Sequence, residues 1–127
     1  MRVLTSGPNY YIRATSFKNE RLFYQNNHRQ MNYVLEQISK ISGKRTSELI
    51  KHSRLAELVE WRMIFTYICR QQGYGSFKEI GVILDNRHHA SIIHAYRMAC
   101  NFIDAKDVDF IGKLNAVKHL LKWTKEI

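Results

Sequence analysis

A short run of basic and polar side chains interrupts the apolar patterns in the second half of the chain. It consists of Arg87, His88, His89, Ala90 and Ser91. The planar guanidinium of arginine pairs bidentately with guanine or with a phosphate, imidazole and hydroxyl groups donate or accept hydrogen bonds at base edges, and the alanine methyl can touch the methyl of thymine. Each residue alone would be a solvated surface residue, but together at the start of a helix they are candidates for contacts to DNA bases.

The same region does not favour a metal site or a catalytic centre. Asp85, His88, His89 and His94 are the candidate ligands, but they lack the helical histidine pair of zinc enzymes, and no nearby cysteine completes a set of four. The chain also carries no nucleophile-base set and no paired-carboxylate motif. We expect no metal, no cofactor and no enzymatic activity.

Two helices that meet at a tight turn would position the run. Ser76 followed three residues later by Glu79 is a capping-box pattern, and apolar residues continue from there at helical spacing. Asp85 and Asn86 end this helix, since their side chains compete for backbone hydrogen bonds and asparagine tolerates the left-handed conformation. A second helix restarts near Arg87 with a polar, basic first turn, which is typical of the recognition helix in a helix-turn-helix.

Two residues of this segment are expected to be structural. Gly81 has no side chain and would let the two helices approach closely, and His94, deeper in the second helix, is expected to hydrogen-bond within the fold more than to contact a ligand. Contacts to a phosphate backbone need charge more than an exact position. The candidates for such contacts are Lys44, Arg45, Lys51, Arg54, Arg62, Lys78 and Arg97.

The helix-turn-helix segment resembles the signature motif of the C-terminal DNA-binding domain of DnaA, the bacterial chromosomal replication initiator. Residues that stand as in the family are Ser76, Glu79, Ile80, Gly81, Arg87, His89, His94 and Ala95, with Ser91 as a conservative replacement. Upstream, residues 51–54 stand in the place of the family's basic loop, and Arg62 falls on one of its two arginines at the start of the next helix. The resemblance covers about residues 31–105. It implies an all-α, Trp-repressor-like bundle that binds double-stranded DNA.

The departures from the family pattern lie among the base-reading positions. His88 replaces an aspartate, Ala90 replaces a threonine, and Asp85 and Asn86 replace two glycines, while Glu60 falls where the other arginine is expected. A histidine can donate or accept where an aspartate only accepts, so we expect an altered base preference.

Charge and length agree with a basic DNA-binding domain. The 127 residues carry 20 Lys and Arg against 11 Asp and Glu, a formal net charge of +9, which favours a polyanionic partner.

The segment Gly43-Lys44-Arg45-Thr46 does not fit a phosphate-binding loop. Ile38 stands where the first glycine is needed, and Arg45 stands where Ser or Thr should follow the lysine. This length leaves no room for a motor domain, and we expect no nucleotide binding. Without a long apolar run, we expect a cytoplasmic protein with no membrane contact.

The periodicity predicts one helical domain. Helices are expected over about 31–41, closed by Gly43, over a short segment capped by Thr46 or Ser47, over 55–72, over the two helix-turn-helix segments, and over 106–124. Residues 1–30 are expected to form an extension that is partly ordered or packed on the domain 31–127. Cys69 and Cys100 lie in apolar helical patterns and are expected to be reduced core residues.

Two functions from different classes follow. The first is a stand-alone, sequence-selective, double-stranded DNA-binding protein that acts in replication initiation or in the regulation of a bacterial, phage or mobile element. The alternative is an adaptor that keeps the bundle without base-specific reading and binds a replication protein. The sequence does not define the target site or the oligomeric state.

Overall fold

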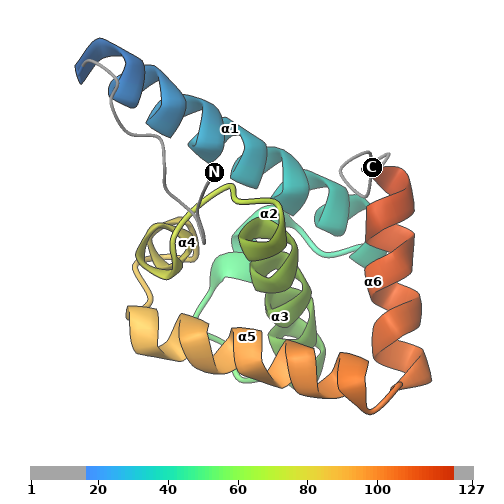
Figure 1. The fold of residues 1–127 in the computed structure, drawn as a ribbon. Helices are drawn as coiled ribbons and strands as arrows, with labels where there is room; N and C mark the ends of the chain where they lie inside the picture. Colours follow the sequence, from blue (N-terminus) through green and yellow to red (C-terminus); the bar gives the residue numbers. More distant parts are fainter. Residues whose placement is uncertain (1–16, 122–127) are drawn as a thin grey trace.

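The computed structural model describes residues 17–121 as an all-α bundle, as the sequence predicts (Figure 1). The helices are α1 (Phe17–Ser42), α2 (Thr46–Ile50), α3 (Ala56–Gln71), α4 (Phe77–Ile83), α5 (His89–Asp104) and α6 (Val108–Leu120). Residues 17–121 contain no strand. No helix in this part of the chain is both long enough and apolar enough to cross a membrane.

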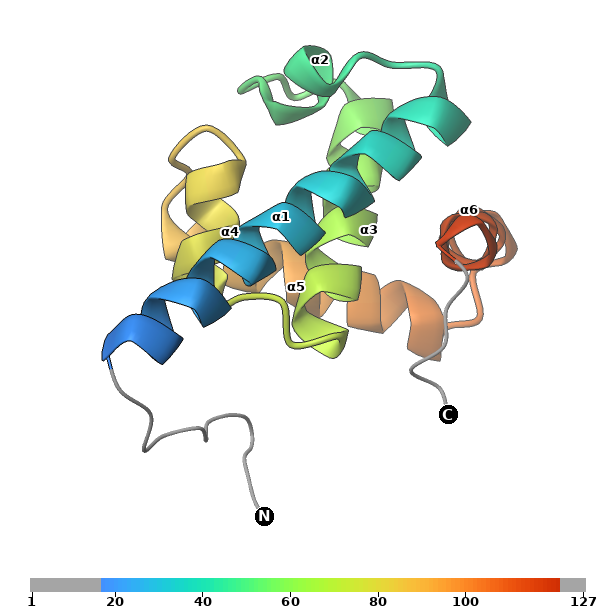
Figure 2. The ribbon, with the colours of Figure 1, turned by 90° about the horizontal axis from the view of Figure 1, so that it is seen from above.

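α3 is the central helix around which the others are arranged. α5 packs along α3 and also against α4, while α1 crosses α3 on another side and α6 contacts α1, α3 and α5. In the view from above, α1 runs diagonally across α3, and its N-terminal end projects beyond the other helices (Figure 2). The helix-turn-helix made of α4 and α5 is therefore attached to the rest of the bundle mainly through α3.

The apolar stripes read from the sequence form the core of this bundle. Every helix contributes at least one fully or nearly fully buried apolar side chain, because residues three and four apart lie on one helical face. The buried apolar residues are Met31, Val34, Leu35 and Ile38 of α1, Leu49 of α2, Leu58, Trp61, Ile64, Phe65, Ile68 and Cys69 of α3, Ile80 and Leu84 at α4, Ile92 and Ala99 of α5, and Phe110, Leu114 and Val117 of α6. Cys69 and Cys100 are free thiols, as predicted; Cys69 lies in the core, whereas Cys100, also predicted to be a core residue, is only partly buried.

The first helix begins at Phe17 and not near Met31. The prediction followed apolar periodicity, and the segment from 17 to 30 is mostly polar. It contains no glycine or proline, however, so nothing in it interrupts a helix. Residues 1–16 and 122–127 lie outside the described part, so the predicted packing of an N-terminal extension is left as a prediction for residues 1–16.

Smaller differences occur at the helix ends. α2 is preceded by Arg45 as N-cap, where Thr46 or Ser47 was expected, because the Glu48 carboxylate accepts a hydrogen bond from the Arg45 backbone N–H at 2.9 Å. α5 begins at His89 and α6 at Val108, each later than predicted. The Asp107 side chain caps α6 by accepting from the backbone N–H of Phe110 at 2.9 Å, which fixes that start.

Candidate nucleic-acid interface

The turn between α4 and α5 is built as the sequence indicates. Ser76 accepts a hydrogen bond from the backbone N–H of Glu79 at 3.1 Å, and the Glu79 carboxylate accepts one from the Ser76 N–H at 2.8 Å, a reciprocal capping box. After α4, Asp85 and Asn86 both adopt the left-handed conformation, with φ of 62° and 57°. Two consecutive residues of this kind reverse the chain sharply and bring the start of α5 back against α4.

Gly81 provides the close approach that this reversal needs. Its carbonyl accepts from the Arg87 N–H at 2.9 Å. A Cβ at position 81 would lie 2.3 Å from the Arg87 carbonyl oxygen, a distance that only a backbone shift could relieve. The position therefore accepts glycine alone without rearrangement.

The first turn of α5 presents its side chains to solvent. His88 is the N-cap, and its Nδ1 accepts from the backbone N–H of Ala90 at 3.1 Å. The His88 and His89 rings stack with their centroids 4.4 Å apart. Residues 88–91 are all exposed, whereas Ile92 is buried. The cap occupies Nδ1 of His88 and leaves its Nε2 available to a ligand.

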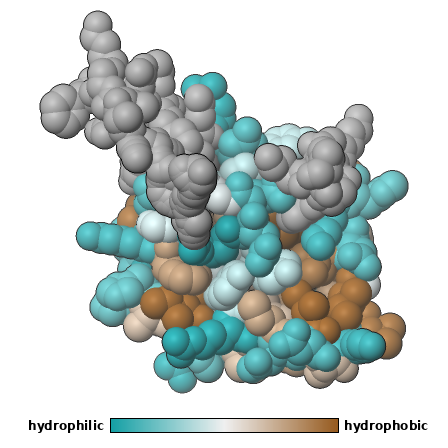
Figure 3. Space-filling model, in the orientation of Figure 1, coloured by the Kyte–Doolittle hydropathy of each residue, from teal (hydrophilic) through white to brown (hydrophobic). Residues whose placement is uncertain are grey.

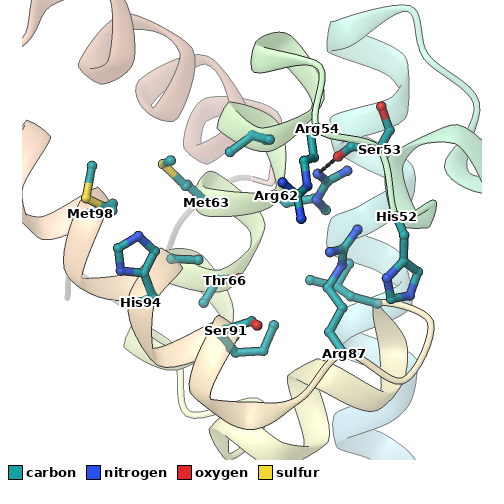
Figure 4. Close-up of a pocket in the computed structure, with 14 residues that line it drawn as sticks. His52, Ser53, Arg54, Arg62, Met63, Thr66, Arg87, Ser91, His94 and Met98 are labelled. Atoms are coloured by element: carbon teal, nitrogen blue, oxygen red, sulfur yellow. Dashed lines mark hydrogen bonds between the residues drawn. The ribbon is translucent and has the colours of Figure 1, made fainter.

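A hollow of about 490 Å³ lies between the first half of α3, the basic loop (residues 51–54) and α5 (Figure 4). Basic and polar side chains line its loop side, and methionines line its opposite end. Of the residues predicted to contact DNA, Arg54, Arg62, Arg87 and Ser91 line it. His94 also lines it and is exposed: on α5 it lies on the face of Ser91, not on that of buried Ile92.

Arg62 anchors the basic loop from inside the fold. It is 7% exposed, and its guanidinium donates to the carbonyls of Leu49 at 3.1 Å and Lys51 at 3.2 Å, and to that of Ser53. Three backbone acceptors around one buried guanidinium fix the course of the loop. An exposed phosphate contact by Arg62, as expected from its charge, would require these hydrogen bonds to be shared or released.

Arg87 anchors the same loop from the helix-turn-helix side. Its guanidinium donates to the Lys51 carbonyl at 2.5 Å, while its Nε is buried and has no hydrogen-bond partner among residues 17–121. The Lys51 carbonyl thus accepts from two arginines, one on α3 and one just before α5. Figure 4 shows both guanidinium groups directed towards the loop.

The two arginines give the hollow an uncompensated positive charge. Burial, and then repulsion by Arg87, lower the pKa of Arg62 to about 10. Burial also lowers the pKa of Arg87, with Asp85 acting in the opposite direction. Both groups are charged at neutral pH, and within residues 17–121 neither forms an ion pair with a carboxylate. An anion in the hollow would relieve this repulsion.

Other predicted phosphate contacts lie away from the hollow. Lys44 pairs with Glu57 at 3.4 Å, and Arg45 lies 3.9 Å from Glu48. Lys78 on α4 and Arg97 on α5 are exposed. None of the four lines the hollow. Lys51 is exposed beside it and contributes its carbonyl to the two arginines.

Glu60, at the position where the resemblance predicts a second arginine, faces the opposite side of α3. Its carboxylate pairs with Lys113 of α6 at 2.5 Å, and the Lys113 ammonium also lies 5.4 Å from the centre of the Trp61 ring. The Lys113 side chain is 36% exposed, because this pair holds it against α3. The substitution at Glu60 therefore does not place a negative charge in the hollow.

The face of the molecule drawn in Figure 3 carries both hydrophilic and apolar areas. Hydrophilic residues run along the lower edge of the molecule, where α5 lies, and an apolar area covers the lower half of α6 (Figure 3). Val108, the first residue of α6, is 81% exposed.

Sequence reasoning missed several residues of the hollow. Thr66 is fully buried and its hydroxyl has no hydrogen-bond partner, and Met63 and Met98 form one end. His52 was noted only as part of the basic loop, yet it contacts Asp85. Helical spacing from Arg62 indicates Thr66, but only the fold shows that α5 and the loop enclose that face.

A helix-turn-helix with a basic loop beside its second helix, carried on an all-α bundle, defines the class of helix-turn-helix DNA-binding domains. Within this class, the chain belongs to the family of the bacterial DnaA protein helix-turn-helix, whose model matches residues 31–98. Two similar proteins are the chromosomal replication initiator proteins DnaA of Wolbachia sp. subsp. Brugia malayi (strain TRS), 27% identical over 100 residues, and of Wolbachia pipientis wMel, 26% identical over 100 residues. Each match covers 77% of this chain and 22% of the relative, so the chain corresponds to a small part of those proteins.

Proposed function

We propose that this chain binds double-stranded DNA selectively and on its own, with the start of α5 in the major groove and the basic loop on the neighbouring backbone or minor groove. It would act in replication initiation or in the regulation of a bacterial, phage or mobile element. The observation that carries the proposal is the hollow, where Arg62 and Arg87 lie together, neither in an ion pair with a carboxylate of residues 17–121, and exposed basic residues flank them.

The start of α5 and the basic loop suit different parts of a duplex. Residues 88–91 are exposed at the N-terminal end of α5, the end that a recognition helix presents to base edges. Lys51 and Arg54 are exposed on a loop whose backbone is fixed by Arg62 and Arg87, so their side chains are free to contact phosphates. A duplex that touches both elements would pass over the hollow.

The Arg87 guanidinium has a double role in this proposal. Without DNA it holds the Lys51 carbonyl, and its second terminal nitrogen has no hydrogen bond within the described residues. We propose that this nitrogen reaches a base or a phosphate, so that one side chain contacts both the loop and the DNA. Arg87→Ala should then cost about 1–3 kcal/mol in affinity for a selected site and relax selectivity at one base pair.

The test begins with selection of bound duplexes from a random DNA pool, using the full 127-residue chain. Affinity for a selected and a scrambled duplex is then measured by fluorescence anisotropy over a range of salt. Each phosphate contact should steepen the log-log dependence on salt by about 0.9. Arg54→Ala should weaken both duplexes equally and reduce that slope, whereas Arg87→Ala should weaken the selected duplex more.

Two results would contradict the proposal. If no duplex is bound at low salt, the positive hollow serves another partner, and the adaptor for a replication protein becomes the better explanation. If duplexes are bound but selection enriches no sequence, and Arg87→Ala changes both affinities equally, DNA binding stands and base reading by α5 does not.

A further inference from the structure

A second contact joins the basic loop to the helix-turn-helix, on the outer side of the arginine pair. The His52 Nε2 lies 3.0 Å from the Asp85 carbonyl oxygen and 3.4 Å from a carboxylate oxygen of the same residue. One proton on Nε2 is therefore near two acceptors of one residue. The partners are 33 positions apart in the sequence and belong to the two elements that the proposed function assigns to DNA.

Asp85 is an unexpected residue on a surface that faces DNA. Asp85 places a carboxylate at the edge of the proposed interface, where phosphates would repel it, and its φ of 62° is a conformation that glycine adopts with less strain. An aspartate here has a cost on both counts. The contact with His52 offers a reason for it, because a glycine could not hold the loop through a side chain.

We propose that His52 and Asp85 form a clamp that sets the position of the basic loop relative to α5, so that the two elements contact one duplex in a fixed register. The inference rests on the proposed function, because it assigns the pair a role in recognising the same DNA. His52 and Asp85 are positioning residues in this scheme, and the clamp acts through Lys51, Arg54 and the first turn of α5.

The surroundings of the pair indicate that the clamp makes a modest but measurable contribution to DNA affinity. Each side chain is 57% exposed, so water screens the interaction. Around the pair, Lys51 and Arg54 come from the same loop, Arg87 from the turn, and Arg62 from α3. Asp85 is the acid among them, and a loss of roughly twofold to fivefold in affinity is expected when an exposed pair of this kind is broken.

A double-mutant cycle on duplex affinity tests the clamp. The variants are His52→Ala, Asp85→Gly and the double variant, each measured on the selected duplex in the full chain. Glycine suits the positive φ at 85, so the substitution removes the carboxylate without adding strain. In the wild-type background, Asp85→Gly should change affinity little, because loss of the carboxylate contact to His52 offsets removal of a negative charge, while the backbone carbonyl at position 85 remains. In the His52→Ala background the same change should tighten binding by about twofold to fivefold, since only the charge effect remains.

Asn86→Gly is the matched control. Asn86 is the next residue and has a φ of 57°, and the two described polar contacts of His52 are both with Asp85, so glycine at 86 adds the same backbone freedom without breaking the clamp. Its effect on affinity should be equal in the wild-type and His52→Ala backgrounds. An Asp85→Gly effect that is also equal in both backgrounds would overturn the inference.

Amide hydrogen exchange of residues 51–55, measured in the DNA-free chain, tests the clamp independently of the proposed function. Exchange should be fastest in His52→Ala and intermediate in Asp85→Gly, where the backbone carbonyl at position 85 still contacts His52. It should be no faster in the double variant than in His52→Ala, and unchanged by Asn86→Gly. Exchange that stays unchanged in all variants would overturn the clamp even if every variant binds DNA. If no variant binds any duplex, the proposed function fails, while the exchange result still decides whether the clamp exists.

Discussion

At the scale of single residues, the interface depends on backbone groups as much as on charged side chains. The Lys51 carbonyl accepts from two arginines, the Gly81 carbonyl from the Arg87 N–H, and the Ala90 N–H donates to His88. These contacts fix the backbone from which the charged side chains extend. A substitution that changes no charge can therefore still disturb the site.

Gly81→Ala is the sharpest case of this kind. Its Cβ would meet the Arg87 carbonyl oxygen at 2.3 Å, and we expect a loss of about 1–3 kcal/mol in the free energy of unfolding, measured by urea denaturation. Gly112→Ala on α6 is the control, because nothing lies within 4 Å of its Cβ. It should stabilise the protein by about 0.5–1 kcal/mol, the usual gain of alanine over glycine inside a helix. Equal effects at the two positions would show that the close approach at Gly81 is not required.

At the scale of secondary-structure elements, α2 is a short helix whose start depends on one carboxylate. The Arg45 backbone N–H donates to Glu48 and lowers the pKa of that carboxyl below its usual value of 4.5, helped by the positive charges of Arg45, Lys44 and Lys51. A carboxyl whose pKa is lowered by folding stabilises the protein above the unfolded pKa, and this stabilisation is lost as pH falls through the folded value.

Glu48→Gln should therefore lower the thermal midpoint at pH 7. In this variant the midpoint should also decrease less steeply below about pH 4.5, the usual pKa of the carboxyl. The measurement is a series of thermal melts followed by circular dichroism from pH 7 to pH 3. Glu36→Gln, at an exposed position on α1, is the control for a general loss of negative charge. If the midpoints of wild type and Glu48→Gln differ by the same amount at every pH, the carboxylate does not cap α2.

The order of elements could be predicted from the sequence because each helix has an apolar stripe and most have a recognisable end. The stripe of α1 from Met31 to Ile38, the capping box at Ser76 and the turn at Asp85 are all local signals. The start of α1 could not be predicted in this way, since its first part is polar and periodicity carries no signal there.

The candidate site was predictable only in part, for a physical reason. Residue types identify Arg87 and Arg62, but their hydrogen bonds to the Lys51 carbonyl join positions 36 and 11 residues apart. The contact of His52 with Asp85 and the enclosure of Thr66 depend in the same way on the packing of α3 against α5. Such contacts follow from the tertiary fold and leave no pattern of spacing in the sequence.

At the scale of the whole molecule, α3 has two sides with different roles. One side, with Arg62, faces the positive hollow, and the other, with Glu60 and Trp61, holds α6 through Lys113. The two sets of contacts share no residue. Stability of the α6 side and binding at the hollow are therefore expected to respond to different substitutions.

Lys113→Ala tests this separation. It removes a partly buried ion pair and a contact with the Trp61 ring, and should cost about 1 kcal/mol in the free energy of unfolding. Its effect on duplex affinity should be smaller than that of Arg54→Ala, which removes the same formal charge beside the hollow. Urea denaturation and anisotropy on the same samples provide the comparison. A loss of affinity as large as that of Arg54→Ala would mean that α6 takes part in binding.

The Lys51 carbonyl, which accepts hydrogen bonds from two arginines, also has a consequence for the rate of DNA association. A loop whose backbone is already held by Arg62 and Arg87 has little conformational entropy to lose when a ligand arrives, so its ordering adds no slow step to association. Encounter then depends on diffusion and on attraction of the polyanion by the net charge of +9. Differences in affinity among DNA sites should consequently arise in the dissociation rate, while the association rate stays nearly the same from site to site.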